Sequence, residues 1–189
     1  MKFLQTDLPG VLLVEPDVFR DARGFFLETF HAARYRAGGI PYDFVQDNHS
    51  RSVRGTLRGL HAQRKRPQGK LVRAVRGEIF DVAVDIRPGS KTFGKWVGFR
   101  LGEDDFRQLF VPPGFAHGFC VLSDAAEVVY KVSALYDAAT ERSINYADPE
   151  LAVSWPVKTP LLSERDRRAE SFAALRARLA RDLEGLSRS

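Results

Sequence analysis

The feature that most constrains this chain is a run of short apolar segments between Thr56 and Tyr136, each closed within a few residues by glycine, proline or acidic residues. Segments this short and rich in Val, Ile and Phe predict β-strands, because a helix needs a longer uninterrupted stretch. Turns at such regular intervals are typical of an antiparallel sandwich or a jelly-roll barrel. The predicted strands of this region are 71–75, 79–87, 96–101, 108–111, 118–122 and 127–132. We therefore predict a mainly β protein with a jelly-roll (double-stranded β-helix) barrel and short flanking helices.

The two ends of the chain differ from this middle region. Towards the N-terminus we predict strands at 11–14 and 25–30 and a short helix at 31–37, which Gly38-Gly39 closes. Near the C-terminus Ser171 is a good cap for a helix whose apolar residues recur every three or four positions, namely Phe172, Leu175, Leu179, Leu183 and Leu186. We expect this stripe to pack on the barrel. The 189 residues suit one domain, with the barrel in 1–166 and a C-terminal helical extension of the same domain in 167–189.

Composition excludes several classes of protein. A single cysteine, Cys120, rules out an intramolecular disulfide, and its apolar neighbours predict a buried thiol. The N-terminus reaches Asp7 before the apolar region of a signal peptide, and no segment has the ~18 apolar residues of a membrane span, so we expect a cytoplasmic protein with no membrane partner. The net charge is +5, but both signs are interspersed and no nucleic-acid-binding motif accompanies them, so we expect no nucleic-acid partner. The small positive excess suits an anionic small molecule.

One turn and the histidine that follows it resemble a motif of the cupin barrels. Pro112-x-Gly114-x-x-His117 matches the second cupin motif, in which the turn places a histidine on the interior wall. The first cupin motif offers a His-x-His pair for a metal ion, whereas this chain has His61-x-Gln63. Glutamine is a poor ligand for a transition metal. We therefore predict a cupin-type barrel with no metal and no other cofactor, in which His61 is available for acid–base chemistry.

A series of further motifs runs in order along most of the chain. They are Asp21-Ala22-Arg23-Gly24-Phe25-Phe26-x-Glu28, Gln46-x-Asn48-x-Ser50, Arg58-Gly59-Leu60-His61-x-Gln63, Lys70-Leu71-Val72-Arg73, Asp81-Val82-Ala83-Val84-Asp85-Ile86-Arg87, Gly114-Phe115-Ala116-His117-Gly118-Phe119, Val129-Tyr130-Lys131, Asp148-Pro149, Trp155-Pro156 and Leu162-Ser163-x-x-Asp166. In this order the motifs resemble the dTDP-4-dehydrorhamnose 3,5-epimerase family, which acts in dTDP-L-rhamnose synthesis. The resemblance covers about residues 3–166, the whole predicted barrel, and leaves out only the C-terminal helix.

The resemblance implies an isomerase that inverts C3 and C5 of dTDP-4-dehydro-6-deoxy-D-glucose, through enolate intermediates, to give dTDP-4-dehydro-L-rhamnose. Inversion beside a ketone needs a base on one face, an acid on the other and an electrophile for the enolate oxygen. Histidine titrates near neutral pH, so His61 is the predicted base, with Asp166 holding and polarising its ring. The Lys70 ammonium suits the enolate oxygen, and the Tyr130 phenol suits reprotonation from the other face. The family assigns the same roles to these four positions.

The resemblance also implies a set of residues that bind the dTDP-sugar substrate. They are Arg23, Glu28, Gln46, Asn48, Arg58, His117, Glu141 and Arg165. Arginine suits a diphosphate because its planar fork binds two phosphate oxygens at once. The family forms a homodimer in which N-terminal strands are exchanged, so Arg23 and Glu28 are expected to serve the partner's site.

One pair of these residues conflicts with regular strand geometry. Arg58 and His61 are three positions apart, and residues three apart point to opposite faces of a regular strand. Both can reach one cavity only if the strand has a bulge or kink between them, and Gly59 permits one.

Two aspartates and the two remaining histidines lie outside the implied catalytic and binding sets. Asp81 and Asp85 share one face of their predicted strand and are candidates for contacting Lys70 from behind. His31 falls in the predicted N-terminal helix, which indicates a structural role, and His49 is undecided.

Three alternative functions stay open at this stage. The first is an epimerase that inverts only C3, or only C5, of a dTDP-4-keto-6-deoxy sugar. The second is a metal-dependent cupin oxygenase, which Gln63 argues against. The third is a non-catalytic sugar-binding cupin, which the presence of a base, an acid and an oxyanion stabiliser argues against.

Overall fold

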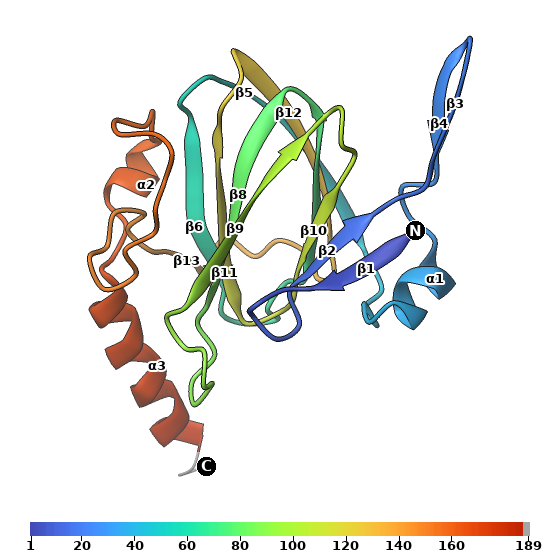
Figure 1. Ribbon diagram of the computed structural model, residues 1–189. Helices are drawn as coiled ribbons and strands as arrows, with labels where there is room; N and C mark the ends of the chain where they lie inside the picture. Colours follow the sequence, from blue (N-terminus) through green and yellow to red (C-terminus); the bar gives the residue numbers. More distant parts are fainter. Residues whose placement is uncertain (187–189) are drawn as a thin grey trace.

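The computed structural model describes the backbone of residues 1–186 and the side chains of residues 1–182. Residues 1–143 form mainly strands, with one short helix among them, and two further helices follow (Figure 1). The strands are β1 (Lys2–Gln5), β2 (Leu12–Glu15), β3 (Val18–Asp21), β4 (Gly24–Leu27), β5 (Gln46–Val53), β6 (Leu57–Gln63), β7 (Lys70–Arg76), β8 (Glu78–Asp85), β9 (Trp96–Gly102), β10 (Gln108–Val111), β11 (Phe115–Val121), β12 (Ala125–Val132) and β13 (Glu141–Ser143). The helices are α1 (Ala32–Ala37), α2 (Glu164–Arg167) and α3 (Phe172–Leu186). The mainly β fold predicted from the sequence is confirmed.

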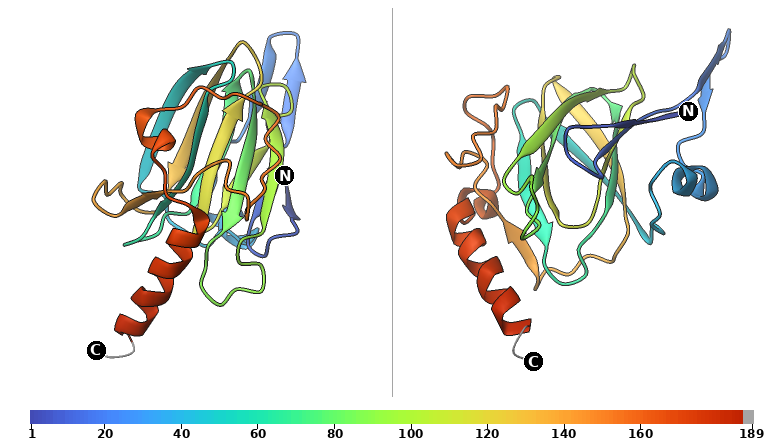
Figure 2. Two further views of the ribbon diagram at one scale, coloured as in Figure 1. Left: turned by 90° about the vertical axis from the view of Figure 1, so that its left-hand side faces the viewer. Right: turned by 60° about the horizontal axis from the view of Figure 1, so that its bottom comes forward.

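Two sheets face each other and form an open-ended barrel, which Figure 2 shows from its lower end. The six-stranded sheet has the order β1-β2-β10-β7-β12-β5, and the five-stranded sheet has the order β13-β6-β11-β8-β9. Neighbouring strands in both sheets are antiparallel. Because neighbours in each sheet are mostly far apart in sequence, the chain passes repeatedly from one sheet to the other, as in a jelly roll.

Apolar side chains fill one end of the barrel and cover the outside of both sheets. The interior cluster includes Ile79, Ala83, Leu109 and Val128, all of them buried. A second cluster lies outside the five-stranded sheet, beneath α3, and a third lies outside the six-stranded sheet around Tyr35 of α1. Burial on both faces explains why apolar residues of β8 stand next to one another, at Ile79–Phe80 and Val82–Val84, and not only at every second position.

Strand β5 was not predicted from the sequence, and its position explains why. It reads Gln-Asp-Asn-His-Ser-Arg-Ser-Val, with no apolar residue before Val53. Its even-numbered residues are more buried than its odd-numbered ones, so polar side chains face the barrel interior. An apolar alternation marks a strand on a packed core. A strand that lines a polar cavity has polar side chains on its inner face, so its sequence shows no apolar alternation.

The predicted helices are confirmed as far as the structure describes them. His31 caps α1, since its ring accepts a hydrogen bond from the Arg34 N–H at 3.5 Å, and this is the structural role expected of it. Ser171 caps α3 by accepting from the Ala174 N–H at 3.2 Å. Phe172 and Leu175 are buried against the barrel and Leu179 packs on the same cluster; the side chains of Leu183 and Leu186 lie outside the described residues. Within residues 1–186, no helix combines the length and the apolar character needed to cross a bilayer.

Candidate active site

A cavity of about 480 Å³ opens at the end of the barrel that the apolar core leaves free. Both sheets contribute to its wall, and the segment leading into α2 closes one side. Its lining includes seven of the residues predicted from the sequence, namely Arg58, His61, Lys70, His117, Tyr130, Arg165 and Asp166. The topology therefore brings together side chains that lie more than 100 positions apart in the chain.

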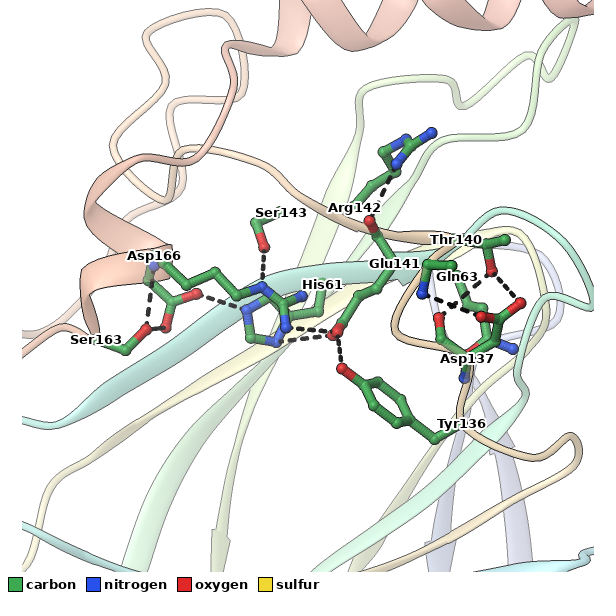
Figure 3. Close-up of polar contacts among 12 residues, drawn as sticks. His61, Gln63, Tyr136, Asp137, Thr140, Glu141, Arg142, Ser143, Ser163 and Asp166 are labelled. Carbon is green, nitrogen blue, oxygen red and sulfur yellow. Dashed lines mark hydrogen bonds and ion pairs between the residues drawn. The ribbon is translucent and has the colours of Figure 1, made fainter.

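His61 of β6 forms a short pair with a carboxylate, as predicted. Its Nε2 lies 2.6 Å from Oδ1 of Asp166, which is almost completely buried. The carboxylate is itself fixed, because the Ser163 hydroxyl donates to Oδ2 at 2.9 Å while capping α2 through the Asp166 N–H. Burial raises the pKa of Asp166, but the hydrogen bonds from His61 and Ser163 outweigh burial and lower the pKa overall. Asp166 is thus a charged partner that orients the ring and leaves Nδ1 turned to the other side (Figure 3).

Lys70 stands at the start of β7, in the sheet that faces His61. Lys70 is half-buried in the cavity wall, and burial lowers its pKa to about 8, although the charges of Glu141 and Asp81 act in the opposite direction. A cation in this setting sees less water, so its attraction for a developing anion is stronger than at the surface.

Tyr130 of β12 lines the cavity from the same sheet as Lys70 and therefore from the side opposite His61. Burial raises the pKa of its phenol, with the charge of Arg58 working against that shift. The phenol therefore keeps its proton at neutral pH and is able to donate it.

The bulge expected at Gly59 is present. Across the pairing of β11 with β6, His117 lies opposite His61 and Phe119 lies opposite Arg58, so two steps along β11 match three along β6. Gly59 has a φ of 132°, and a Cβ at this position would lie 2.5 Å from the Cα of Gly118. The extra residue turns Arg58 into the cavity beside His61, which a regular strand does not allow.

His117 and Asp81 form a second buried histidine–carboxylate pair. Nε2 of His117 lies 2.8 Å from Oδ1 of Asp81, while Oδ2 of Asp81 is buried and has no hydrogen-bond partner within the described residues. Burial lowers the pKa of His117 despite the nearby carboxylate, which keeps the ring neutral. Asp81 therefore lies behind the site in contact with His117, and its charge raises the pKa of Lys70.

Asp85 belongs to a turn and not to the site, so the expectation that it contacts Lys70 is wrong. Its carboxylate accepts hydrogen bonds from the side chains of Arg87, Ser90 and Thr92 at 2.6–2.9 Å. Burial raises its pKa, but these hydrogen bonds outweigh burial and lower the pKa well below the usual range. Period-two alternation placed Asp85 on the face of Asp81, but the strand ends at this residue and the side chain serves the turn that follows.

A network that the sequence did not predict connects the cavity mouth to His61. Oε1 of Glu141 lies 3.9 Å from Nδ1 of His61, and its Oε2 accepts from the Tyr136 hydroxyl and from Arg165, each at 2.5 Å (Figure 3). Burial raises the pKa of Glu141, but the hydrogen bonds from Arg165 and Tyr136 outweigh it and lower the pKa overall. Arg165 also donates to the Ser143 hydroxyl at 3.0 Å. Glu141 and Arg165 were predicted as binding residues, whereas Tyr136 carried no signal beyond being a second phenol near Tyr130.

Two predicted binding residues stand at the edge of the site. Asn48 borders a neighbouring hollow of about 350 Å³, which shares Tyr130 with the main cavity, and its side-chain oxygen accepts from Gln46 at 2.9 Å. His49, undecided from the sequence, points to the outer surface, where it pairs with Glu127 at 3.1 Å.

Arg23 and Glu28 lie outside the cavity of their own chain. Arg23 is at the tip of the β3–β4 hairpin, exposed and paired with Asp21 at 2.6 Å. The hairpin extends beyond the two main sheets (Figure 1) and contacts the β9–β10 connection, where the rings of Phe25 and Phe106 lie 4.7 Å apart. Glu28 follows the hairpin and pairs with Arg34 of α1 at 2.8 Å. Neither residue contributes to the site within one chain.

Together the fold and the site define a class of protein: a cupin-like jelly roll whose cavity holds a histidine–carboxylate base, an ammonium and an opposing phenol, all suited to moving protons. Comparison with known proteins specifies the family. The family model described as dTDP-4-dehydrorhamnose 3,5-epimerase matches residues 5–174, and the chain belongs to this family.

Individual relatives agree with the family model. The chain is 54% identical over 175 residues to a dTDP-4-dehydrorhamnose 3,5-epimerase of Pseudomonas aeruginosa, an alignment that covers 92% of this chain and 97% of the relative. It is 44% identical over 178 residues to a dTDP-4-dehydrorhamnose 3-epimerase of Streptomyces niveus, covering 93% and 86%. Among solved structures, the Legionella pneumophila epimerase in complex with dTDP-4-keto-L-rhamnose superposes with a TM-score of 0.91 at 48% identity, covering 94% of this chain and 96% of that chain.

Proposed function

We propose that this protein epimerises dTDP-4-dehydro-6-deoxy-D-glucose at C3 and C5 to give dTDP-4-dehydro-L-rhamnose. The observation that carries the proposal is the placement of His61, with its carboxylate partner, and Tyr130 on opposite sheets across one cavity. A base and an acid on opposite sides of a substrate are what inversion requires, whereas a binding module has no need of either. The family membership of the chain and the names of its relatives support the same reaction.

In the proposed mechanism, His61 removes the proton from the carbon next to the C4 ketone. Nδ1 takes the proton, because Nε2 is committed to Asp166, and the carboxylate stabilises the imidazolium that forms. The electrons of the broken C–H bond form the C–C double bond of the enolate, and the carbonyl electrons move to its oxygen. Lys70 stabilises that oxygen.

Tyr130 then donates its phenolic proton to the opposite face of the same carbon, which restores the ketone with inverted configuration. The tyrosinate and the imidazolium return to their starting states by proton exchange with solvent, so the cycle is balanced and needs no redox partner. The same groups act once at each carbon.

The dTDP part of the substrate is proposed to bind near the cavity mouth. Arg58 and Arg165 line the cavity and offer two guanidinium groups to the diphosphate, and His117 offers a neutral ring from the cavity floor. Gln46, Asn48 and Glu141 are proposed to bind the nucleoside and sugar from the adjacent wall. The Legionella protein, which binds a dTDP-sugar, supports this class of ligand.

A monoepimerase is the second candidate, and the Streptomyces niveus 3-epimerase is the observation that favours it. The test incubates the purified protein with dTDP-4-dehydro-6-deoxy-D-glucose in D2O and follows the proton signals at C3 and C5 by NMR. Deuterium at both carbons is the expected result. Deuterium at C3 alone replaces the proposal with the monoepimerase, and tight binding with no exchange replaces it with a binding module.

We also propose that the active form is a homodimer in which the β3–β4 hairpin reaches the partner's site. Three phenylalanines on the hairpin are largely exposed: Phe19 at 65%, Phe25 at 57% and Phe26 at 70%. An aromatic patch of this kind is typical of an interface. The outer edge of β5 ends the six-stranded sheet next to the cavity, and the cavity lacks Arg23 and Glu28 of its own chain. The cytoplasm stays the proposed location, on the grounds given by the sequence.

A further inference from the structure

Residues 134–137 lie in the connection from β12 to β13 and carry Tyr136 to Glu141, yet burial of their side chains does little to hold them in place. Leu135 is 61% exposed and Tyr136 is 51% exposed. The position of a surface loop normally depends on the burial of its side chains or on hydrogen bonds of its backbone. Since burial is small here, the backbone hydrogen bonds decide where the loop lies.

Those bonds come from the side-chain amides of three glutamines, which we call the glutamine cradle: Gln46, Gln63 and Gln68. Gln68 donates from Nε2 to the Ala134 carbonyl at 2.7 Å. Gln63 donates from Nε2 to the Leu135 carbonyl at 3.1 Å and accepts at Oε1 from the Asp137 N–H at 2.8 Å. Gln46 accepts at Oε1 from the Tyr136 N–H at 3.0 Å. Four consecutive residues are thus each bound by an amide side chain from a neighbouring segment.

Gln63 is the central member, because it is buried and uses its whole amide. Besides the two bonds to the loop, its Nε2 donates to the Arg66 carbonyl at 2.9 Å, which joins the β6–β7 turn to the same point. Two carbonyls and one N–H around the amide allow only one orientation of its nitrogen and oxygen. This residue stands where a metal-binding cupin has its second histidine, and here it binds backbone (Figure 3).

The cradle ends at the catalytic base. The Tyr136 hydroxyl donates to Oε2 of Glu141 at 2.5 Å, and the other oxygen of that carboxylate lies 3.9 Å from Nδ1 of His61. A small shift of the loop breaks the tyrosine–glutamate bond and leaves Arg165 as the remaining partner of that oxygen, so Glu141 is held less firmly beside the proton-accepting nitrogen. Misplacement by about 1 Å is enough to cost ~10²-fold in rate in such sites.

We propose that Gln63 and Gln68 are positioning residues for the reaction: they hold the backbone of residues 134–137 so that Tyr136 fixes Glu141 next to His61. This inference rests on the proposed function. It assigns no contact with substrate to either glutamine, since both act through the loop.

The test compares three single variants, each replacing glutamine by methionine, which has a similar length but no amide. Gln63→Met removes three bonds, Gln68→Met removes one, and Gln5→Met, at an exposed position at the end of β1, is the matched control. We expect kcat/KM to fall by about tenfold or more for Gln63→Met and by severalfold for Gln68→Met, with no change for Gln5→Met. Melting curves establish that each variant is folded; if Gln63→Met is not, Gln68→Met carries the test.

A double-mutant cycle separates positioning from simple stability. In a Tyr136→Phe background the hydroxyl that the cradle positions is gone, so adding Gln63→Met, or Gln68→Met, is expected to have a much smaller effect than in the wild type. The proposal is overturned if both glutamine variants fold and keep wild-type kcat/KM. It is equally overturned if Tyr136→Phe itself changes nothing, or if the glutamine effects are undiminished in the Tyr136→Phe background.

A wrong proposed function gives a different result from a wrong cradle. In that case the wild-type protein exchanges no deuterium into the substrate, which contradicts the proposed epimerisation and leaves the cradle untouched. The cradle is then judged from amide hydrogen exchange at Asp137, whose N–H is bound to Gln63. Faster exchange in Gln63→Met than in Gln5→Met supports it, and equal exchange overturns it.

Discussion

Each nitrogen of the His61 ring has a carboxylate on its side, and the two carboxylates are held differently. Asp166 lies 2.6 Å from Nε2 and is buried, whereas Glu141 lies 3.9 Å from Nδ1 and is tied to Tyr136 and Arg165. Direct contact on one side and a gap on the other give the ring an orienting partner and an accessible nitrogen. This asymmetry is the geometric basis for assigning proton abstraction to Nδ1.

The base is tested by His61→Asn, which keeps a polar side chain but removes the titrating ring. We expect exchange at both C3 and C5 to fall by ~10²–10⁴-fold, the usual contribution of a general base. Binding of dTDP, measured by calorimetry, is expected to stay within a few-fold of wild type, because a base acts on the barrier and contributes little to ground-state affinity. Asp166→Asn is expected to be milder, since the ring remains. A His61→Asn enzyme with more than about a tenth of wild-type turnover rules His61 out as the base.

Tyr130→Phe separates the acid from the base. The variant keeps the aromatic ring and loses the transferable proton. His61 still removes a proton, and the enolate is reprotonated from the same face, so deuterium is expected to enter unreacted substrate while little inverted product forms. One NMR time course in D2O measures both quantities. Inversion at a near wild-type rate contradicts the assignment, and Tyr136 is then the next phenol to test.

The ammonium of Lys70 predicts the alkaline side of the pH profile. Because burial lowers its pKa to about 8, Lys70 loses its charge as the pH rises through 8, and kcat/KM is expected to fall above that pH. Tyr130 does not account for this limb, since its own pKa is raised. The Glu141 charge raises the pKa of Lys70, so Glu141→Gln is expected to move the limb to lower pH. A wild-type profile that stays flat to pH 10 removes Lys70 from the mechanism.

At the scale of the elements, β6 decides which side chains meet in the cavity. The bulge at Gly59 is possible only because Gly59 and Gly118 lie against each other, with room for no Cβ between them. The alternation of a regular strand would place Arg58 and His61 on opposite faces. The bulge that packs against Gly118 brings both side chains to the cavity.

Gly59→Ala tests this contact. Two costs are expected, a positive φ and a Cβ 2.5 Å from the Cα of Gly118, and the second displaces backbone. Gly24→Ala is the matched control for stability, because Gly24 has the same φ, 132°, but no atom lies within 4 Å of the added Cβ. We expect Gly24→Ala to lower stability by about 1–3 kcal/mol through backbone strain, and Gly59→Ala to lower it further and to abolish activity, as measured by thermal melting and the NMR assay. Equal effects of the two substitutions on stability contradict the close packing at the bulge.

At the scale of the whole molecule, one chain holds the chemistry but only part of the proposed binding set. The cavity contains His61, Lys70 and Tyr130, while Arg23 stands on a hairpin away from it (Figure 1). If the hairpin completes the partner's site, one chain can carry an inactivating substitution in its cavity and another chain one in its hairpin. Mixing these two chains is then expected to restore some active sites.

Subunit mixing tests this arrangement. His61→Asn and Arg23→Ala chains are each expected to be poorly active alone. After joint unfolding and refolding, a mixed dimer has one site with the His61 of one chain and the Arg23 of the other, so activity is expected to recover to about a quarter of wild type if the chains pair at random and each intact site is fully active. Refolded single variants are the control. A mixture no more active than the sum of its parts contradicts exchange of the hairpin.

The sequence by itself determined the strands that pack on apolar neighbours, the cap of the C-terminal helix and the chemical types of the site residues. Those features depend on local patterns, such as an apolar segment between turns or a serine before a helix, and local patterns are visible in one sequence. The motif resemblance added His61, Lys70, Tyr130 and Asp166 as a set, and the structure places all four around one cavity.

Only the tertiary structure decided the rest, because it depends on contacts between distant segments. Strand β5 was not predicted, because its inward face meets a polar cavity and not a core. Asp81 and Asp85 are alike in the sequence, yet one lies against His117 and the other against a turn. The glutamine cradle joins Gln46, Gln63 and Gln68 to a loop 66 or more positions away, and no spacing along the chain records that the ends of three segments meet at Tyr136.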